Sequence, residues 1–482
     1  FQVESRAQMN TLPRLKPRCF YDIVVEVALI RPGPIQGRSV NPYLRRRSGR
    51  EEVTYLHPLL EPALRQTLGV PLFQEQLMRI ATDAAGLSGA RADQLRRAMG
   101  AKRSPERMEA LKGDLMAGMK ERGIDALTRE RIFEQLKGFA DFGFPESHSF
   151  SFAHIVYASS WLKVHAPEHF YAAILASQPM GFYSPATLVQ DARRHGVRVV
   201  GPSVNDSLVD ASVQRVGEDE AGESYRPGRP ESLPVRGVVP LDVDRELAVR
   251  IGLSQVRGLG AAAERIVEAR RRGVFTSQAD LARRAHVSAS AMEKLAMAGA
   301  LECLGVGRRE GAWAAGALAQ PHARSGQWQP FLPGTEVGSL VPELPSLSEA
   351  ERMRSDVDTT GLTPGKHPFS YVRAALPATT LRAGDLGQHL AGRIVDVAGV
   401  VTHRQRPHTG GGITFLSLED ETGLVNVSVS VGAWKKFRRV CLESNALLVR
   451  GTLEWGDGAI NVQAFRIAPV ELPIDVRSRD FR

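Results

Sequence analysis

The sequence contains few cysteines and no long apolar run. Its three cysteines, Cys19, Cys303 and Cys441, are far apart and form no CxxC pair, so they predict neither a disulfide framework nor a cysteine zinc site. No stretch approaches the roughly 20 apolar residues that cross a bilayer, and the N-terminus has no signal-peptide pattern. We therefore expect a protein of the reducing cytoplasm, without a membrane role.

Clustered carboxylates are also scarce. Two-metal nucleotidyl transfer needs carboxylates that hold two ions about 3.5–4 Å apart, usually on adjacent strands. The sequence has only two Asp-x-Asp pairs, Asp242/Asp244 and Asp356/Asp358, and neither lies in a predicted strand. We expect no catalytic residue and no bound metal in this chain.

Histidines gather between positions 148 and 169 without forming a zinc motif. His165 and His169 are four residues apart, but Pro167 lies between them and there is no HExxH pattern. We therefore reject a zinc site here.

What the sequence does contain is typical of a globular, multidomain protein. Its 482 residues are enough for about three domains. Hydrophobic residues make up 43% and charged residues 24%, so the chain should fold. The 62 Lys and Arg residues exceed the 53 Asp and Glu residues and give a formal charge of +9, which favours polyanionic partners without proving one.

The residue pattern predicts a multidomain α+β protein. Helical periodicity dominates 1–207, and 208–249 reads as a linker because it is charged and rich in Gly and Pro. Compact helices return over 250–304, and 305–390 is predicted to be linker and connecting helices. Alternating residues over 391–468 indicate five strands with a helix between the third and fourth, the order of an OB-fold barrel, and 469–482 is a tail.

Two glycines punctuate the compact helical segment. Gly258-Leu259-Gly260 joins two short helical runs, which is the helix-hairpin-helix arrangement, and a weaker echo over 287–305 suggests a tandem pair. Small turn residues let backbone N–H groups approach a DNA phosphate without contacting bases. An ordinary helical hairpin is the competing interpretation; the glycine pair and the echo favour DNA, with Arg257 beside the turn.

Three further clusters are candidates for phosphate or strand binding. Ser147, His148 and Ser149 are set between aromatics at a helix start, where an N-cap is the plainer alternative. The LRRAMGAKR run (95–103) places cations at a helix end, where a solvated face is equally expected. The first barrel loop is predicted to carry His403, Arg404, Arg406 and His408, with Phe415 as a stacking residue, although a solvated hairpin explains the loop nearly as well.

Several blocks of sequence resemble the fingers of bacterial C-family, polymerase III alpha-like DNA polymerases. They are collinear: FQVESRAQM, ALIRPGPIQG, YLHPLLEPALRQTLGVPLFQEQLM, ADQLRRAMGAKR and FGFPESHSFSFAHIVYASSWLKVHAPEHFYAAIL. The resemblance continues through GLSQVRGLG and GLTPGKHPFSYVR into the barrel, and the error-prone, damage-tolerant branch is the more similar one. It implies that 1–207 comprises a palm remnant and helical fingers, and that the catalytic aspartates lie outside this sequence.

The resemblance also implies a set of residues that face nucleotide or primer-template: Arg31, Gln74, Gln76, Arg96, Arg97, Lys102, Ser147, His148 and Ser149. The implied activity is transfer of a nucleotide from a dNTP to a primer 3′ end, with Mg²⁺ held by the complete enzyme. The implied partners are primer-template DNA and dNTPs, together with a sliding clamp and mutagenesis accessory proteins. A non-catalytic DNA-binding protein and a replicative alpha subunit are the alternatives, and this chain alone is expected not to extend a primer.

Overall fold

The structure is a computed structural model that describes residues 3–30, 40–98, 104–140, 144–216, 241–318, 342–406, 411–456, 459–472, 474 and 479–481. Its internal contacts divide the chain into two units, Phe1–Ser160 with Asp457–Ala459, and Trp161–Gly456 with Ile460–Arg482. Among the described residues, none of the helices has both the length and the apolarity that a membrane span requires.

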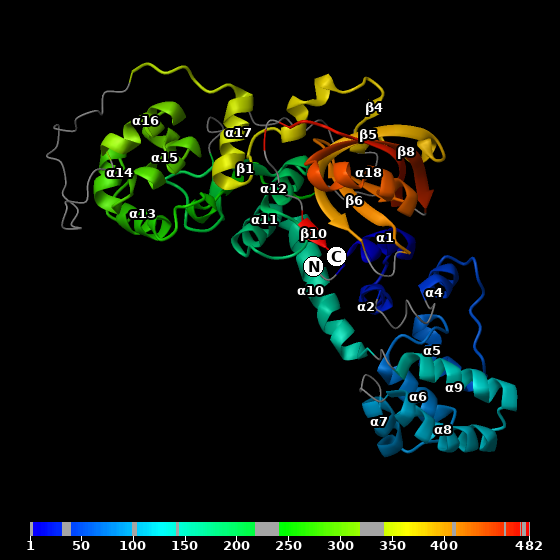
Figure 1. The fold of residues 1–482 in the computed structure, drawn as a ribbon. Helices are drawn as coiled ribbons and strands as arrows, with labels where there is room; N and C mark the ends of the chain where they lie inside the picture. Colours follow the sequence, from blue (N-terminus) through cyan, green and yellow to red (C-terminus); the bar gives the residue numbers. More distant parts are fainter. Residues whose placement is uncertain are drawn as a thin grey trace. The chain divides into compact units, whose positions relative to one another are not determined.

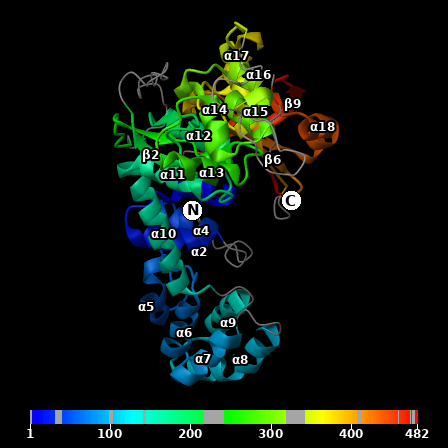
Figure 2. The ribbon, with the colours of Figure 1, turned by 90° about the vertical axis from the view of Figure 1, so that its left-hand side faces the viewer.

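The first unit is helical, as the periodicity predicts (Figure 1). Its helices are α1 (Arg6–Leu15), α2 (Phe20–Leu29), α4 (Val40–Arg47), α5 (Glu61–Leu64), α6 (Gln74–Asp83), α7 (Gly89–Ala98), α8 (Ser104–Glu121), α9 (Ala126–Ala140) and α10 (Glu146–His165), with the 3₁₀ helices η1 (Pro58–Leu60) and η2 (Arg65–Thr67). Helices α5 to α9 share one apolar core, in which α8 and α9 lie side by side (Figure 2).

A second core of the first unit joins α1, α2 and α4 to the start of α6. Phe73, just before α6, belongs to this core, whereas Leu77, one turn into the helix, belongs to the core of α5 to α9. Ala153 of α10 also packs into the second core. Helix α6 therefore links the two groups of helices.

The second unit begins at Trp161, within the last turns of α10, and Pro167 starts its next helix. Pro167 occupies the first turn of α11 (Pro167–Ala176), where its missing N–H costs nothing, so α10 and α11 are separate helices. Helix α12 (Pro185–Arg194) follows, and then a small sheet of β1 (Arg198–Val200), β2 (Ser212–Arg215) and β3 (Leu247–Arg250) in the order β1-β3-β2.

The predicted linker 208–249 needs correction at both of its ends. It contributes strand β2 and most of strand β3, which pair with each other in antiparallel register. Val249 on β3 is fully buried in a core with α11 and α12, so short apolar stretches at each end are folded despite the polar composition between them. Residues 217–240 lie outside the described ranges.

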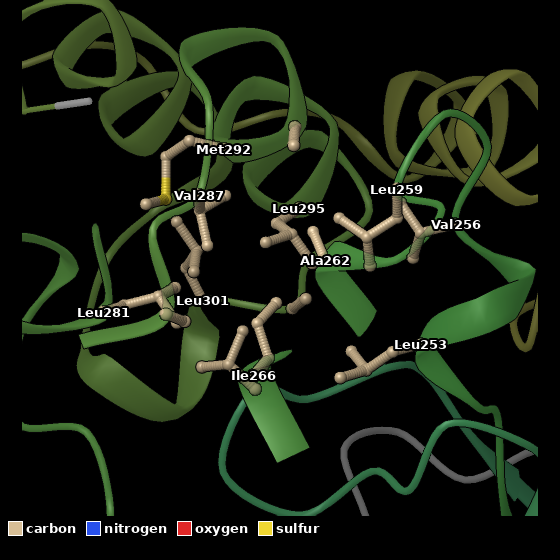
Figure 3. Close-up of a cluster of buried hydrophobic side chains, with 14 of the residues drawn as sticks. Leu253, Val256, Leu259, Ala262, Ile266, Leu281, Val287, Met292, Leu295 and Leu301 are labelled. Carbon is tan, nitrogen blue, oxygen red and sulfur yellow. The ribbon is translucent and has the colours of Figure 1, made fainter. Parts of the chain in front are cut away.

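The glycine-punctuated segment folds as a helical domain around one core (Figure 3). Its elements are η5 (Leu253–Gln255), α13 (Ala262–Arg270), α14 (Gln278–Ala285), α15 (Ala289–Met297), η6 (Glu302–Leu304) and α16 (Arg308–Leu318). Ala315 of α16 lies in the same core, so the domain extends beyond its predicted end at 304. Helix α17 (Glu349–Thr360), started by a Ser348–Glu351 capping box, packs against α15.

The C-terminal strands close into the predicted five-stranded OB barrel. The strands are β5 (Ile394–Gln405), β6 (Thr414–Glu419), β7 (Leu424–Val429), β8 (Ala446–Gly456) and β9 (Ala459–Pro469), with α18 (Val431–Glu443) between the third and fourth. Strand β5 pairs antiparallel with both β6 and β8, and β9 lies between β7 and β8, which closes the barrel. Other elements lie around the barrel: η7 (Pro368–Tyr371), η8 (Arg373–Ala375), β4 (Thr380–Leu381), η9 (Ala383–Asp385), η10 (Gln388–Leu390) and β10 (Arg479–Phe481).

Candidate nucleic-acid interface

Three sequence blocks of the first unit meet at the start of α10. The Tyr21 hydroxyl donates to the Glu146 carboxylate at 2.6 Å, and the Glu146 backbone N–H donates to the Glu75 carboxylate at 2.9 Å. The backbone N–H of Gln74 donates to the carbonyl of Phe144 at 3.0 Å. The FQEQ block and the ESHS block, about 70 residues apart in sequence, therefore form one surface around this helix end.

At that surface, Ser147 and His148 are exposed and Ser149 is not. The His148 ring makes edge contacts with Phe144 and Phe152, with ring centroids 5.3 and 4.5 Å away, which hold the imidazole at the helix start. Ser149 is fully buried, and its hydroxyl donates to the Val24 carbonyl at 2.5 Å. The expectation that Ser149 contacts nucleotide is therefore corrected, because its hydroxyl already joins α10 to α2.

Gln76 is likewise a structural residue. Its side-chain oxygen accepts from the backbone N–H groups of Leu72 and Phe73 at 2.8 and 3.0 Å, and its amide nitrogen donates to Ala63 and Thr67. The side chain is buried, and these bonds fix the loop before α6. Of the two glutamines, only the half-buried Gln74 stays available for a ligand.

Arg96 and Arg97 are exposed on α7, where both pair with Asp93 at 2.9 and 2.7 Å. The hydrogen bond from Arg96 holds the pKa of the Asp93 carboxyl below its usual range. Helix α7 packs in the core of α5 to α9, whereas the start of α10 adjoins the other core of the unit. No contact joins the α7 arginines to Ser147 or His148 among the residues described, and Arg31 and Lys102 lie outside those residues.

The Gly258-Leu259-Gly260 turn is open to a ligand. Both glycines have positive φ, 81° and 50°, and a Cβ added at either one would meet no atom within 4 Å. Leu259 is buried and anchors the turn in the domain core (Figure 3). Within the described part of the chain, the backbone N–H groups of Gly258, Gly260 and Ala261 have no hydrogen-bond acceptor. A helix start with exposed, unpaired N–H groups suits an anionic phosphate.

The second glycine turn differs from the first, because only Gly305 has positive φ and a side chain caps the turn. This turn is Gly305-Val306-Gly307, at the start of α16, and the Gly307 N–H donates to the Glu310 carboxylate at 3.1 Å. Arg308 pairs with the buried Asp356 at 2.6 Å. In the described part of the chain, the first turn thus leaves N–H groups unpaired, whereas the Gly307 N–H of the second is paired.

Arg257 lies beside the open turn but is bound to α17. Its backbone N–H donates to the Thr359 carbonyl at 2.8 Å, and its guanidinium donates to the Asp358 carbonyl at 3.2 Å. A cation at the carboxyl end of a helix complements the helix dipole. Arg257 therefore holds the hairpin domain against α17 as well as bordering the turn.

The prediction that His403 and Arg404 lie in a DNA-binding loop is wrong in its local structure. Both residues are in strand β5 and both are 8% exposed. The Arg404 guanidinium donates to the carbonyls of Cys441 and Ser444 at the end of α18, at 2.6 and 2.7 Å, and a His403 ring nitrogen is 2.6 Å from the Phe182 carbonyl oxygen. Arg406 follows the strand and is exposed, so it stays a candidate, and His408 lies outside the described residues.

The outer face of β6, β7 and β9 offers a surface that the sequence analysis identified only in part. Phe415 lies opposite Ser428, and Ser417 opposite Asn426, with the residues between them buried in the barrel. Phe465 on β9 is 47% exposed. Aromatic rings among small polar side chains on a sheet face are suited to stacked bases. Period-two alternation in AINVQAFRI could have identified Phe465. It places Val462 and Ala464 on the buried face of the strand and Phe465 on the outer face.

A buried ion pair holds the barrel against α12. Arg194 donates to Glu419 at 2.9 Å, and the Thr187 hydroxyl donates to the other oxygen of the same carboxylate at 3.0 Å. Burial raises the pKa of Glu419, and Arg194 opposes that rise. Burial also disfavours the Asp191 carboxylate, but the cations of Lys163 and Arg194 outweigh this effect and hold its pKa at about 2.

The described residues do not fit a Mg²⁺ site. No group of three or more His, Cys, Asp or Glu side chains is placed to hold a metal ion within the ranges that the structure covers. Of the Asp-x-Asp pairs, Asp242 lies 2.7 Å from His165, and Asp356 is bound to Arg308.

Three segments of the chain match known domain families. Residues 1–123 match the bacterial DNA polymerase III alpha subunit finger domain, residues 196–311 the helix-hairpin-helix motif, and residues 395–470 the OB-fold nucleic acid binding domain. These matches confirm the predicted fold class.

Whole-chain relatives carry the name error-prone DNA polymerase. The protein of that name from Mycobacterium bovis is 51% identical over 486 residues, which cover 100% of this chain and 41% of the relative. The Nocardia farcinica protein of the same name is 50% identical over 494 residues, and this alignment covers 100% of this chain and 40% of the relative. The chain thus spans about two fifths of the length of the curated relatives it matches.

One solved structure that matches part of the chain shows a local likeness. Asparaginyl-tRNA synthetase from Pyrococcus horikoshii has 19% identity over 20% of this chain and 24% of its own chain, with a TM-score of 0.18. At this score the likeness adds nothing to the barrel described above.

Proposed function

We propose, from its homology to error-prone DNA polymerases along its whole length, that this chain supplies the fingers and the DNA-gripping modules of such an enzyme. The complete enzyme would transfer nucleotides from dNTPs to a primer 3′ end in the cytoplasm, using Mg²⁺ held by residues outside this chain. Its role would be translesion synthesis in damage-induced mutagenesis, with a sliding clamp and mutagenesis accessory proteins as further partners.

Within this function the two units have different tasks. We assign nucleotide and primer-end contacts to Gln74, Arg96, Arg97, Ser147 and His148, which are at least partly accessible in the first unit. The open hairpin turn would hold duplex DNA by its backbone, and the barrel face would hold a single strand. Neither assignment involves base-specific hydrogen bonds, which suits an enzyme that must accept any template sequence.

The structural observation that carries the DNA-gripping part of the proposal is the open turn at Gly258 and Gly260. Its three unpaired N–H groups can donate to one phosphate, and a hydrogen bond to a charged group contributes about 1.5–3 kcal/mol. Side chains at both glycines would keep the DNA strand away from these N–H groups. Loss of only one such hydrogen bond would already lower the affinity for DNA about tenfold or more.

The test is the binding of a fluorescent primer-template by the 482-residue chain with Gly258 and Gly260 replaced by Val. Binding should weaken at least tenfold, and the salt slope should fall, because fewer phosphates are contacted. Gly123→Val is the matched control, since Gly123 has φ of 78° and equally open surroundings in the other unit. If the hairpin variant binds duplex as tightly as this control, the turn is only a structural connection.

A further inference from the structure

A basic cavity of about 220 Å³ lies in the first unit, and none of its lining residues belongs to α10. It is formed where the ends of α1 and α4 meet. Six of its nine lining residues are cations and none is acidic; the cations are Arg14, Lys16, Arg18, Arg45, Arg47 and Arg50. The cavity volume is many times the roughly 10–15 Å³ that one water requires, so the cavity has room for a phosphate group.

Part of this charge is balanced within the protein. Arg47 pairs with Asp22 at 2.5 Å, and Arg45 pairs with Glu51 at 2.8 Å. Lys16 and Arg18 are exposed, and their side chains have no hydrogen-bond or ion-pair partner in the described part of the chain. Two cations on the rim are therefore available to a ligand.

Helix dipoles explain only some of the cations. Arg14 is in the last turn of α1, and Arg45 and Arg47 are in the last turn of α4, where positive charge stabilises the helix end. Lys16 and Arg18 follow the end of α1, and the latter does not cap it. A purely structural role thus leaves Arg18 unexplained.

Lys16 occupies a backbone conformation that disfavours lysine. Its φ is 50°, in the left-handed region, at the C-cap of α1. Glycine is preferred at such a position, and another residue there costs about 1–2 kcal/mol. The lysine is therefore held on the cavity rim at a local cost to stability.

We propose that this cavity binds a phosphate group of a nucleic-acid strand or a nucleotide, with Lys16 and Arg18 as its direct ligands. Guanidinium and ammonium groups form charge-assisted hydrogen bonds with phosphate, and the arginine fork can bind two oxygens at once. The inference rests on the proposed function, because it adds a second phosphate contact in the unit assigned to nucleotide and primer-template.

The test uses the 482-residue chain with Lys16→Gly and Arg18→Gln combined. Two probes are titrated: a fluorescent primer-template from about 50 to about 200 mM salt, and inorganic tripolyphosphate. The control combines Lys120→Gln with Arg131→Gln, which removes the same charge from exposed positions on α8 and α9 of the same unit.

Relative to this control, the cavity variant should bind at least one probe at least fivefold more weakly. A loss confined to primer-template, with a salt slope reduced by about 1–2, identifies the strand as the source of the phosphate. A loss confined to tripolyphosphate identifies the nucleotide. Equal binding of both probes by the cavity variant and the control overturns the proposal.

Two comparisons separate this result from other failures. If the parent chain binds no primer-template at all, the proposed function fails, while the tripolyphosphate titration still tests the cavity. Lys16→Gly should keep or raise the melting temperature, because glycine relieves the left-handed strain. If Lys16→Gly instead lowers the melting temperature, the single variant Arg18→Gln decides the question. Weaker binding of a probe by Arg18→Gln then supports the phosphate site, and unchanged binding overturns it.

Discussion

Glu26 should make the first unit less stable as pH rises. Its side chain is fully buried in α2, and neither carboxylate oxygen has a hydrogen-bond partner in the described part of the chain. Burial raises its pKa from 4.5 to about 8. Because a buried charge without a partner is costly, the folded protein keeps this group protonated at neutral pH.

The direction of this pH dependence follows from the protons bound by the folded and unfolded states. Between pH 4.5 and about 8 the unfolded chain releases the Glu26 proton and the folded chain keeps it, so the unfolded state is favoured increasingly as pH rises. One pKa unit corresponds to about 1.4 kcal/mol, so raising the pH from 5 to 8 should destabilise the unit by about 3 kcal/mol through this residue alone.

Glu26→Gln removes the titration and keeps the shape of the side chain. The variant should gain about 3 kcal/mol over the parent between pH 5 and pH 8, which corresponds to roughly 6–12 °C in melting temperature for a unit of this size. The two units need not unfold together, so the stability of the first unit has to be measured locally. Hydrogen exchange in peptides that cover α2 reports the stability difference between variant and parent at each pH.

Glu61→Gln is the control, since it makes the same chemical change on an exposed side chain of the same unit. Its stability relative to the parent should not change across this pH range. If Glu26→Gln and the parent respond to pH identically, the carboxyl of Glu26 does not stay protonated in the folded state, and the reasoning from burial is wrong.

Two further predictions concern the barrel. Replacing Phe415 and Phe465 together with Ala should weaken single-strand binding by about 2–6 kcal/mol if both rings stack on bases, and fluorescence titration with single-stranded DNA checks this; unchanged affinity would remove the face from the interface. Arg404→Ala should lower the free energy of unfolding of the barrel by about 1–3 kcal/mol for each carbonyl at the end of α18 that is left unpaired. Urea unfolding measures this loss. A variant as stable as the parent would show that these carbonyls bind water instead.

Local sequence determined most of the fold. Apolar periodicity marks the helices of the first unit, Pro167 separates α10 from α11, and period-two alternation marks the barrel strands. These features depend on residues within one or two turns or on one strand, so they are visible without tertiary contacts. The Gly258-Leu259-Gly260 turn belongs to the same class, because positive φ is a property of the residue and its neighbours.

Tertiary structure decided which polar side chains remain available to a ligand. Ser149 bonds to Val24, which is 125 residues away, and Thr187 bonds to Glu419, which is 232 residues away. A polar residue at a helix start or in a strand looks the same in sequence whether its partner is the protein or a ligand. Only the folded chain shows that Arg404 is bound to α18 and that Lys16 and Arg18 border a common cavity. The physical reason is that burial and hydrogen-bond pairing are set by contacts between segments far apart in sequence, which local periodicity does not encode.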